Sequence, residues 1–128
     1  MFEYELRIRF VDTDASGRIH YTAMFRYFEA AEFEFLRSRG VAYQEFGEHS
    51  FPRVHVECDY KGATKYDDLL KICVEVARVG TSSFTFAFQA TAFDGRHVAT
   101  GSITVVCLAK ATGKPVGIPE AFRQALTA

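Results

Sequence analysis

The chain lacks several features that mark large classes of proteins. It has no tryptophan, no run of about 18 apolar residues, and no charged start followed by an apolar stretch, so we expect neither a membrane span nor a secretory signal. Its three cysteines (Cys58, Cys73 and Cys107) are far apart and form no CxxC spacing, which indicates free, buried thiols in a reducing compartment. We therefore predict a cytoplasmic protein.

Charge is neither strong nor clustered. The 15 Lys and Arg residues nearly balance the 16 Asp and Glu residues, for a net charge of −1, and this argues against nucleic acid as a partner. The four histidines (His20, His49, His55 and His97) lack the close spacing of a zinc motif, and the chain has no G-x-S-x-G segment and no glycine-rich phosphate loop. We expect no metal and no bound cofactor.

Aromatic side chains are abundant, with 13 Phe and 6 Tyr among 128 residues. A chain of this length suffices for a single domain with its own core, and we predict one domain over residues 1–128. The aromatic content indicates a core, or an interface between subunits, built on large flat side chains.

The spacing of apolar residues predicts one long helix among several strands. Residues 2–10 alternate between apolar and charged side chains, as in a strand with one solvated face. From about 22 to 39 the apolar period is about 3.6, which predicts a helix with Thr22 as its N-cap and Gly40 as its stop. Further elements are predicted as strands at 53–61, 69–79, 83–93 and 97–108, and as a short helix at 119–126.

The order of these elements predicts the fold class. Asp94-Gly95 lies between the last two strands and favours a tight type I′ hairpin. With a single long helix available, we expect an α+β architecture in which an antiparallel sheet of about five strands curls around that helix. The exposed face and edges of such a sheet favour self-association as a homodimer or homotetramer.

The segment most suited to chemistry is 10–21, between the first strand and the start of the helix. Free amides at a helix start can polarise a carbonyl oxygen, and a nearby carboxylate can attack the carbon or take a proton from water. Asp14 and the backbone amide of Tyr21 would supply both parts. A loop rich in aspartate also caps helices without any catalytic role, and His20 beside a helix start more often packs than acts as a base.

Several segments together resemble the signature of hot-dog-fold thioesterases of the 4-hydroxybenzoyl-CoA thioesterase type. The similarity is carried by residues 10–21, 26–31, 36–40, 57–60, 66–69, 112–115 and 119–120, and it spans nearly the whole chain. The resemblance implies a hot-dog fold and the hydrolysis of an acyl-CoA to a free acid and CoA, without a metal or a redox cofactor.

The resemblance also implies roles for individual residues. Asp14 matches the family's catalytic carboxylate, and Asp12 a supporting one. The backbone amide of Tyr21 would bind the thioester oxygen, Gly17 would let the chain turn close to the substrate, and His20 is a further catalytic candidate. Whether Asp14 acts as a general base or as a nucleophile stays open.

Contacts with CoA are expected elsewhere. Members of the family that act on aromatic substrates carry basic residues that meet CoA in one turn, and this chain has Ser83 in that turn instead. Ser83 is therefore a candidate CoA contact, and Lys61 and Arg78 are candidates for binding the phosphates. Three alternatives remain: an acyl-carrier-protein thioesterase, an enoyl-thioester hydratase that pairs a histidine with a carboxylate, and an acyl-CoA-binding module without catalysis.

Overall fold

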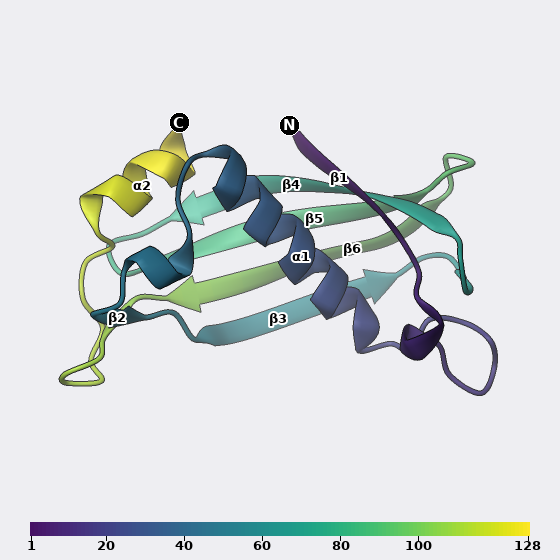
Figure 1. Ribbon diagram of the computed structural model, residues 1–128, viewed down its shortest axis with the longest axis horizontal. Helices are drawn as coiled ribbons and strands as arrows, with labels where there is room; N and C mark the ends of the chain where they lie inside the picture. The colour runs from purple at the N-terminus through teal and green to yellow at the C-terminus, as the bar shows by residue number, and fades with distance from the viewer.

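The computed structural model describes all 128 residues and contains one main antiparallel sheet (Figure 1). Its strand order is β1-β4-β5-β6-β3. The strands are β1 (Phe2–Arg7), β3 (Arg53–Tyr60), β4 (Leu69–Val79), β5 (Ser83–Ala92) and β6 (His97–Val106), and a separate short pair joins β2 (His49–Ser50) to β7 (Leu108–Ala109). The helices are α1 (Ala23–Ser38), α2 (Glu120–Thr127) and the 3-10 turns η1 (Phe10–Asp12) and η2 (Tyr43–Glu45).

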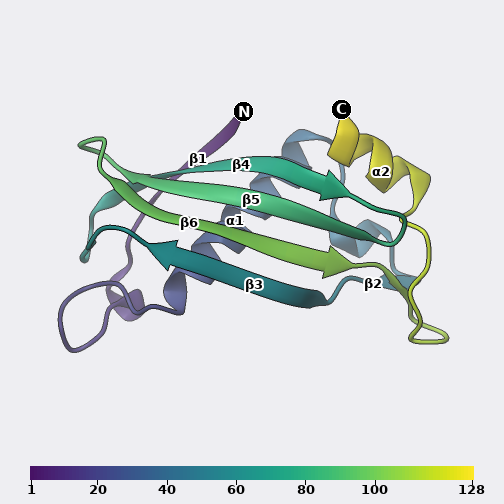
Figure 2. The same cartoon turned by 180° about the vertical axis from the view of Figure 1, so that it is seen from behind.

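Helix α1 crosses one face of the sheet, and the opposite face carries no helix (Figures 1 and 2). The bare face is polar: Thr85 and Thr104 pair their hydroxyls across β5 and β6 at 2.9 Å, and Ser102 donates to Glu57 at 3.0 Å. This is the hot-dog arrangement that the resemblance implies, with a sheet wrapped around one long helix.

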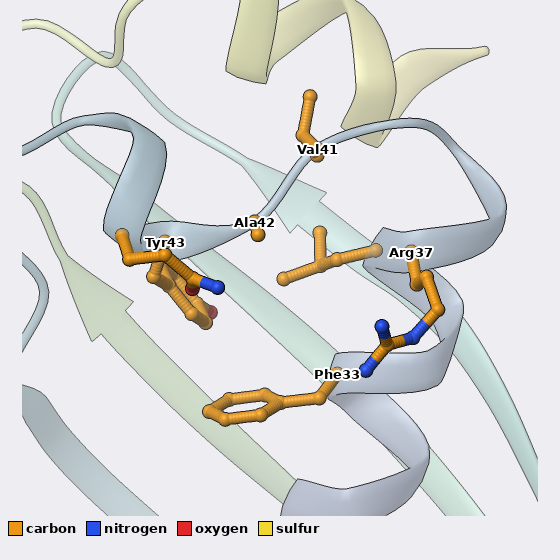
Figure 3. Close-up of a pocket in the computed structure, with 7 residues that line it drawn as sticks. Phe33, Arg37, Val41, Ala42 and Tyr43 are labelled. Carbon is orange, nitrogen blue, oxygen red and sulfur yellow. The ribbon is translucent and has the colours of Figure 1, made fainter.

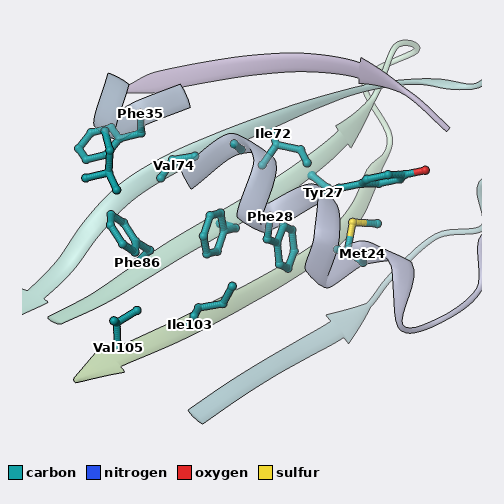
Figure 4. Packing of buried hydrophobic residues seen from close by; sticks show 14 of the residues in the cluster. Met24, Tyr27, Phe28, Phe35, Ile72, Val74, Phe86, Ile103 and Val105 are labelled. Carbon is teal, nitrogen blue, oxygen red and sulfur yellow. The ribbon is translucent and has the colours of Figure 1, made fainter. Parts of the chain in front are cut away.

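Phenylalanine rings fill the space between α1 and the sheet (Figure 4). Phe28 of α1 is fully buried and stacks on Phe88 of β5, with ring centroids 4.7 Å apart and planes 8° from parallel. Gly101 of β6 makes this possible, because a Cβ at that position would lie 2.5 Å from the Phe28 ring and 2.7 Å from the carbonyl of Glu57. The aromatic content thus serves the core, as the composition suggests.

A buried acid ties α1 to the edge strand β3. Glu32 is completely buried, and its Oε2 accepts hydrogen bonds from Arg53 at 2.6 Å and from the Tyr43 hydroxyl at 2.5 Å, while its Oε1 has no partner. Burial raises the pKa of Glu32 in spite of the nearby Arg53 guanidinium. Arg53 also pairs with Glu29 of α1 at 3.5 Å, so the helix and the first residue of β3 are joined by two ion pairs, of which only that with Glu32 involves a buried acid.

Several local predictions need correction. The strand predicted over 2–10 ends at Arg7, because the chain turns into η1, and the strand predicted over 97–108 is divided between β6 and β7. The hairpin at Asp94-Gly95 is not type I′, since only Gly95 has a positive φ (+91°) and its N–H donates to Ala92. It is a type I turn followed by a left-handed glycine, the usual three-residue hairpin.

The cysteines also differ from expectation. All three are free, but only Cys107 is buried, whereas Cys58 and Cys73 are half-buried. None of the helices has the length and apolar character needed to cross a bilayer.

Candidate active site

The loop between β1 and α1 is fixed at its base by Asp12. This carboxylate is 5% exposed, and it accepts hydrogen bonds from the Tyr27 hydroxyl at 2.6 Å and from the Arg26 guanidinium, both on α1. Burial raises its pKa, but the hydrogen bonds from Tyr27 and Arg26 outweigh burial and hold the pKa below the usual value. The Asp12 carbonyl also accepts the N–H of His20 at 2.8 Å. Asp12 thus connects the loop to the helix.

A second set of contacts holds the far side of the loop. Ile19 donates its N–H to the Thr64 carbonyl at 3.0 Å, and the backbones of Arg18 and Lys65 form an isolated antiparallel β-bridge. The N–H of Asp14 donates to the Arg18 carbonyl at 2.9 Å. Gly17 lies within this turn with φ of +83°, a conformation that side-chain-bearing residues rarely adopt. The sequence therefore needs glycine at Gly17 to close the turn.

Asp14 is exposed at the tip of the loop. Its Oδ1 accepts hydrogen bonds from the hydroxyl of Ser16 and from the Ser16 N–H at 2.8 Å, while its Oδ2 has no partner in the chain. These two bonds, with smaller contributions from His20 and Arg18, hold the pKa of Asp14 below its usual value. Asp14 is therefore ionised at neutral pH and presents one free carboxylate oxygen.

Tyr21 stands at the start of α1 with its N–H unpaired. Its carbonyl accepts a hydrogen bond from the Tyr60 hydroxyl of β3, whereas no acceptor within the chain meets its N–H. Unpaired N–H groups at a helix start carry partial positive charge and point at whatever occupies the adjoining space. This amide is suited to holding an oxygen that develops negative charge.

His20 is engaged by its neighbours and makes no hydrogen bond to Asp14. Its Nδ1 lies 2.8 Å from the Thr22 hydroxyl and accepts the Thr22 N–H at 3.2 Å, and its ring stacks on Tyr21 at 4.6 Å. An accepting Nδ1 places the proton of the neutral ring on Nε2. Thr22 is the N-cap of α1, as predicted, but its hydroxyl bonds His20 rather than a free helix amide.

Comparison with known proteins decides the family. The model of the thioesterase-like superfamily matches residues 8–126. The chain belongs to this family.

Individual relatives agree with that membership. A crystal structure of a hypothetical protein from Aquifex aeolicus is 31% identical, covers 98% of this chain and 99% of its own, and superposes with a TM-score of 0.91. The acyl-CoA thioesterase YbgC of Haemophilus influenzae is 28% identical over 97% of this chain and 93% of its own length. A 1,4-dihydroxy-2-naphthoyl-CoA thioesterase from Synechocystis, at 20% identity, covers 98% of this chain and 95% of its own and has a TM-score of 0.93. The resemblance to hot-dog thioesterases is confirmed for family and fold.

The structure separates the remaining predicted site residues of the thioesterase into two groups. Lys61 follows β3 and lies at the same end of the sheet as the Asp14 loop (Figure 1). Ser83 begins β5 at the opposite end, where its hydroxyl accepts a hydrogen bond from Arg78 at 2.9 Å. Since β5 has 10 residues, these two ends lie roughly 30 Å apart. Arg78 and Ser83 therefore cannot reach the Asp14 of their own chain.

The structure contains no cluster of three or more His, Cys, Asp or Glu side chains arranged to hold an ion. A small cavity of about 90 Å³ lies at the other end of α1, between Phe33, Leu36 and Val41 (Figure 3). It is lined by none of the predicted site residues, so it does not belong to the Asp14 loop.

Three residues that orient the loop were not among the predicted site residues. Arg26 and Tyr27 are consecutive on α1, and both reach Asp12, while Tyr60 reaches Tyr21 from β3. A polar Arg-Tyr pair inside an otherwise apolar helix start was the available signal, because a buried tyrosine hydroxyl needs a partner. Tyr60 gave no such signal, since its partner is a backbone carbonyl 39 residues away.

Proposed function

We propose that this chain hydrolyses a CoA thioester, with Asp14 as the reacting carboxylate and the Tyr21 N–H as the donor to the thioester oxygen. The observation that carries the proposal is the pairing, on one short loop, of an ionised carboxylate having a free oxygen with an unpaired amide at a helix start. Family membership supports the reaction, because its named members include acyl-CoA and aryl-CoA thioesterases.

The reaction balances in either of two ways. As a general base, Asp14 takes a proton from water, the resulting hydroxide attacks the thioester carbon, and the CoA thiolate leaves with that proton. As a nucleophile, Asp14 attacks the carbon itself, CoA leaves as its thiol after protonation by water, and a water molecule then cleaves the anhydride. In both, the carbonyl oxygen becomes negative and is stabilised by the Tyr21 amide.

The arrangement of His20 favours hydrolysis over hydration of an enoyl thioester. A hydratase of this architecture pairs a histidine with a carboxylate, whereas Nδ1 of His20 is occupied by Thr22 and no hydrogen bond joins His20 to Asp14. His20 serves here to brace the start of α1 through Thr22 and through its stacking on Tyr21.

Self-association through β3 would complete the site. β3 is an edge strand of the sheet, and it carries three exposed large side chains: Val54 (58% exposed), Val56 (46%) and Tyr60 (43%). An uncovered edge of this kind can pair with a strand of another subunit. Two-fold antiparallel pairing of β3 with its copy reverses the ends of the sheet. This pairing would bring Ser83 and Arg78 of the partner subunit to the end of the sheet that carries Asp14. Both residues would then lie about 15 Å from the shared β3 edge.

Light scattering tests this association. We expect a homodimer or a larger even assembly at micromolar concentration, and Val56→Lys should shift it toward monomer with loss of activity. A monomeric wild-type chain that hydrolyses CoA thioesters at full rate would refute the shared site. A cytoplasmic location remains a prediction of the sequence.

Asp14→Asn tests the catalytic assignment, with Asp94→Asn as a matched control. Asp94 is also an exposed turn aspartate, with a pKa lowered by hydrogen bonds from Arg96, but it lies in the β5–β6 turn. Release of free thiol should be followed for both aliphatic and aryl CoA thioesters, because the relatives' names include both acyl-CoA and gentisyl-coenzyme A thioesterases. We expect Asp14→Asn to lose a factor of ~10² to 10⁴ in kcat and Asp94→Asn to lose little. Equal rates in the two folded variants would refute the role of Asp14.

A further inference from the structure

A groove of about 510 Å³ runs between β1 and α1, on the side of the molecule away from β3. Its volume falls within the range of small-molecule sites in proteins, roughly 300 to 1,000 Å³. The residues that line it include three arginines, Arg7, Arg9 and Arg26, and one acid, Asp12. The wall therefore carries an excess of two positive charges.

Two of the three arginines, Arg7 and Arg9, have no carboxylate partner in the chain. Arg26 is paired with Asp12, which is itself fixed by Tyr27. Arg7 donates to the backbone carbonyl of Asp67 at 3.0 Å, an acceptor without net charge. The guanidinium of Arg9 has no acceptor in the chain, although its backbone N–H is anchored to the Tyr27 hydroxyl at 3.1 Å. Two arginines without a carboxylate partner therefore remain at the groove, and a bound anion would supply the missing opposite charge.

The rest of the groove is apolar. Leu6 and Tyr4 of β1 and Ala30 of α1 line it beside the charged groups, and Val11 is 74% exposed at one end. Guanidinium forks match the oxygens of phosphate and carboxylate groups in a bidentate manner. An apolar floor next to such forks suits a ligand that joins an anionic group to a less polar body.

We propose that this groove is a binding site for an amphipathic anion, recognised through Arg9 and Arg7 at its phosphate or carboxylate group. The site goes beyond the proposed hydrolysis and does not require it. Two sources share the chemistry, namely the phosphate groups of coenzyme A and a free carboxylic acid such as the one that hydrolysis would release.

Calorimetric titration at low salt tests the proposal with three probes: inorganic pyrophosphate, adenosine 3′,5′-bisphosphate and hexanoate. The test variant is Arg9→Gln, and Arg37→Gln is the matched control, since Arg37 is an exposed arginine of α1 about 16 Å along the helix from Arg26. We expect saturable binding to the wild type, weakened about tenfold by Arg9→Gln and less than twofold by Arg37→Gln, because a hydrogen bond to a charged group contributes roughly the free energy of a tenfold change in affinity.

The probes and a further variant make each outcome informative. Preference for the two phosphate probes would assign the site to coenzyme A phosphates, and preference for hexanoate would assign it to a free acid. Arg7→Gln repeats the test should Arg9→Gln fail to fold. The same titration on Asp14→Asn should give unchanged affinity, which separates this site from the catalytic proposal. Absence of saturable binding to all three probes, or equal weakening by Arg9→Gln and Arg37→Gln, would overturn the inference.

Discussion

Replacing Tyr27 with phenylalanine removes the hydroxyl that fixes the base of the loop between β1 and α1. That hydroxyl donates to Asp12 at 2.6 Å and accepts the Arg9 N–H at 3.1 Å, and both Tyr27 and Asp12 are at most 6% exposed. Loss of one hydrogen bond to a buried charge and one neutral bond should cost about 2 to 4 kcal/mol. With a urea m-value of about 2 kcal/mol/M, the middle of the usual range, the unfolding midpoint of Tyr27→Phe should fall by about 1 to 2 M.

The pH dependence sharpens this test. The pKa of Asp12 is lower in the folded chain than its usual value near 3.8, so its contribution to stability is present above that value and is lost as pH falls through the folded pKa. The midpoint difference between the wild type and Tyr27→Phe should therefore shrink in acid. In a double-mutant cycle, Asp12→Asn and Tyr27→Phe should be strongly non-additive. Additive losses, or equal midpoints for wild type and Tyr27→Phe at neutral pH, would show that this hydrogen bond does not support the loop.

Other predictions concern the core and its buried acid. Burial raises the pKa of Glu32, so its contribution to stability is complete below about pH 4.5 and is lost as pH rises through the folded pKa. Urea titrations at several pH values should show this loss of unfolding free energy in the wild type and not in Glu32→Gln. Gly101→Ala places a Cβ 2.5 Å from Phe28 and 2.7 Å from a backbone oxygen, so it should lower the unfolding free energy by about 1 to 3 kcal/mol, and an unchanged urea midpoint would contradict that packing.

The helix and the long strands were predictable because their signal is local. The apolar period that predicts a helix over 22–39 agrees with α1 at Ala23–Ser38, and the predicted strand 69–79 coincides with β4. The end of a strand was predicted wrongly where tertiary contacts decide it. The strand predicted over 2–10 ends at Arg7, because the chain turns into η1 and Asp12 bonds Tyr27 and Arg26 of α1.

The candidate site was predictable only in part, for a related reason. The loop that carries Asp14 and the amide of Tyr21 is continuous in sequence, so residue types and family resemblance could place both. Whether Arg78 and Ser83 can lie near Asp14 depends on strand direction and on how two subunits associate. Within one chain they lie at the opposite end of the sheet from the Asp14 loop, roughly 30 Å away.

The unpaired amide of Tyr21 is the proposed oxyanion donor, and it can be removed by changing a single atom. Replacing the peptide bond between His20 and Tyr21 with an ester removes that N–H and leaves both side chains in place. We predict that kcat for a CoA thioester falls by a factor of ~10² to 10³, as for loss of one oxyanion donor. The urea midpoint should fall only slightly, because the N–H has no partner in the folded chain and only the His20 carbonyl, which accepts the Ala23 N–H at 2.9 Å, becomes a weaker acceptor. An ester-containing protein that folds and turns over at the wild-type rate would contradict this prediction.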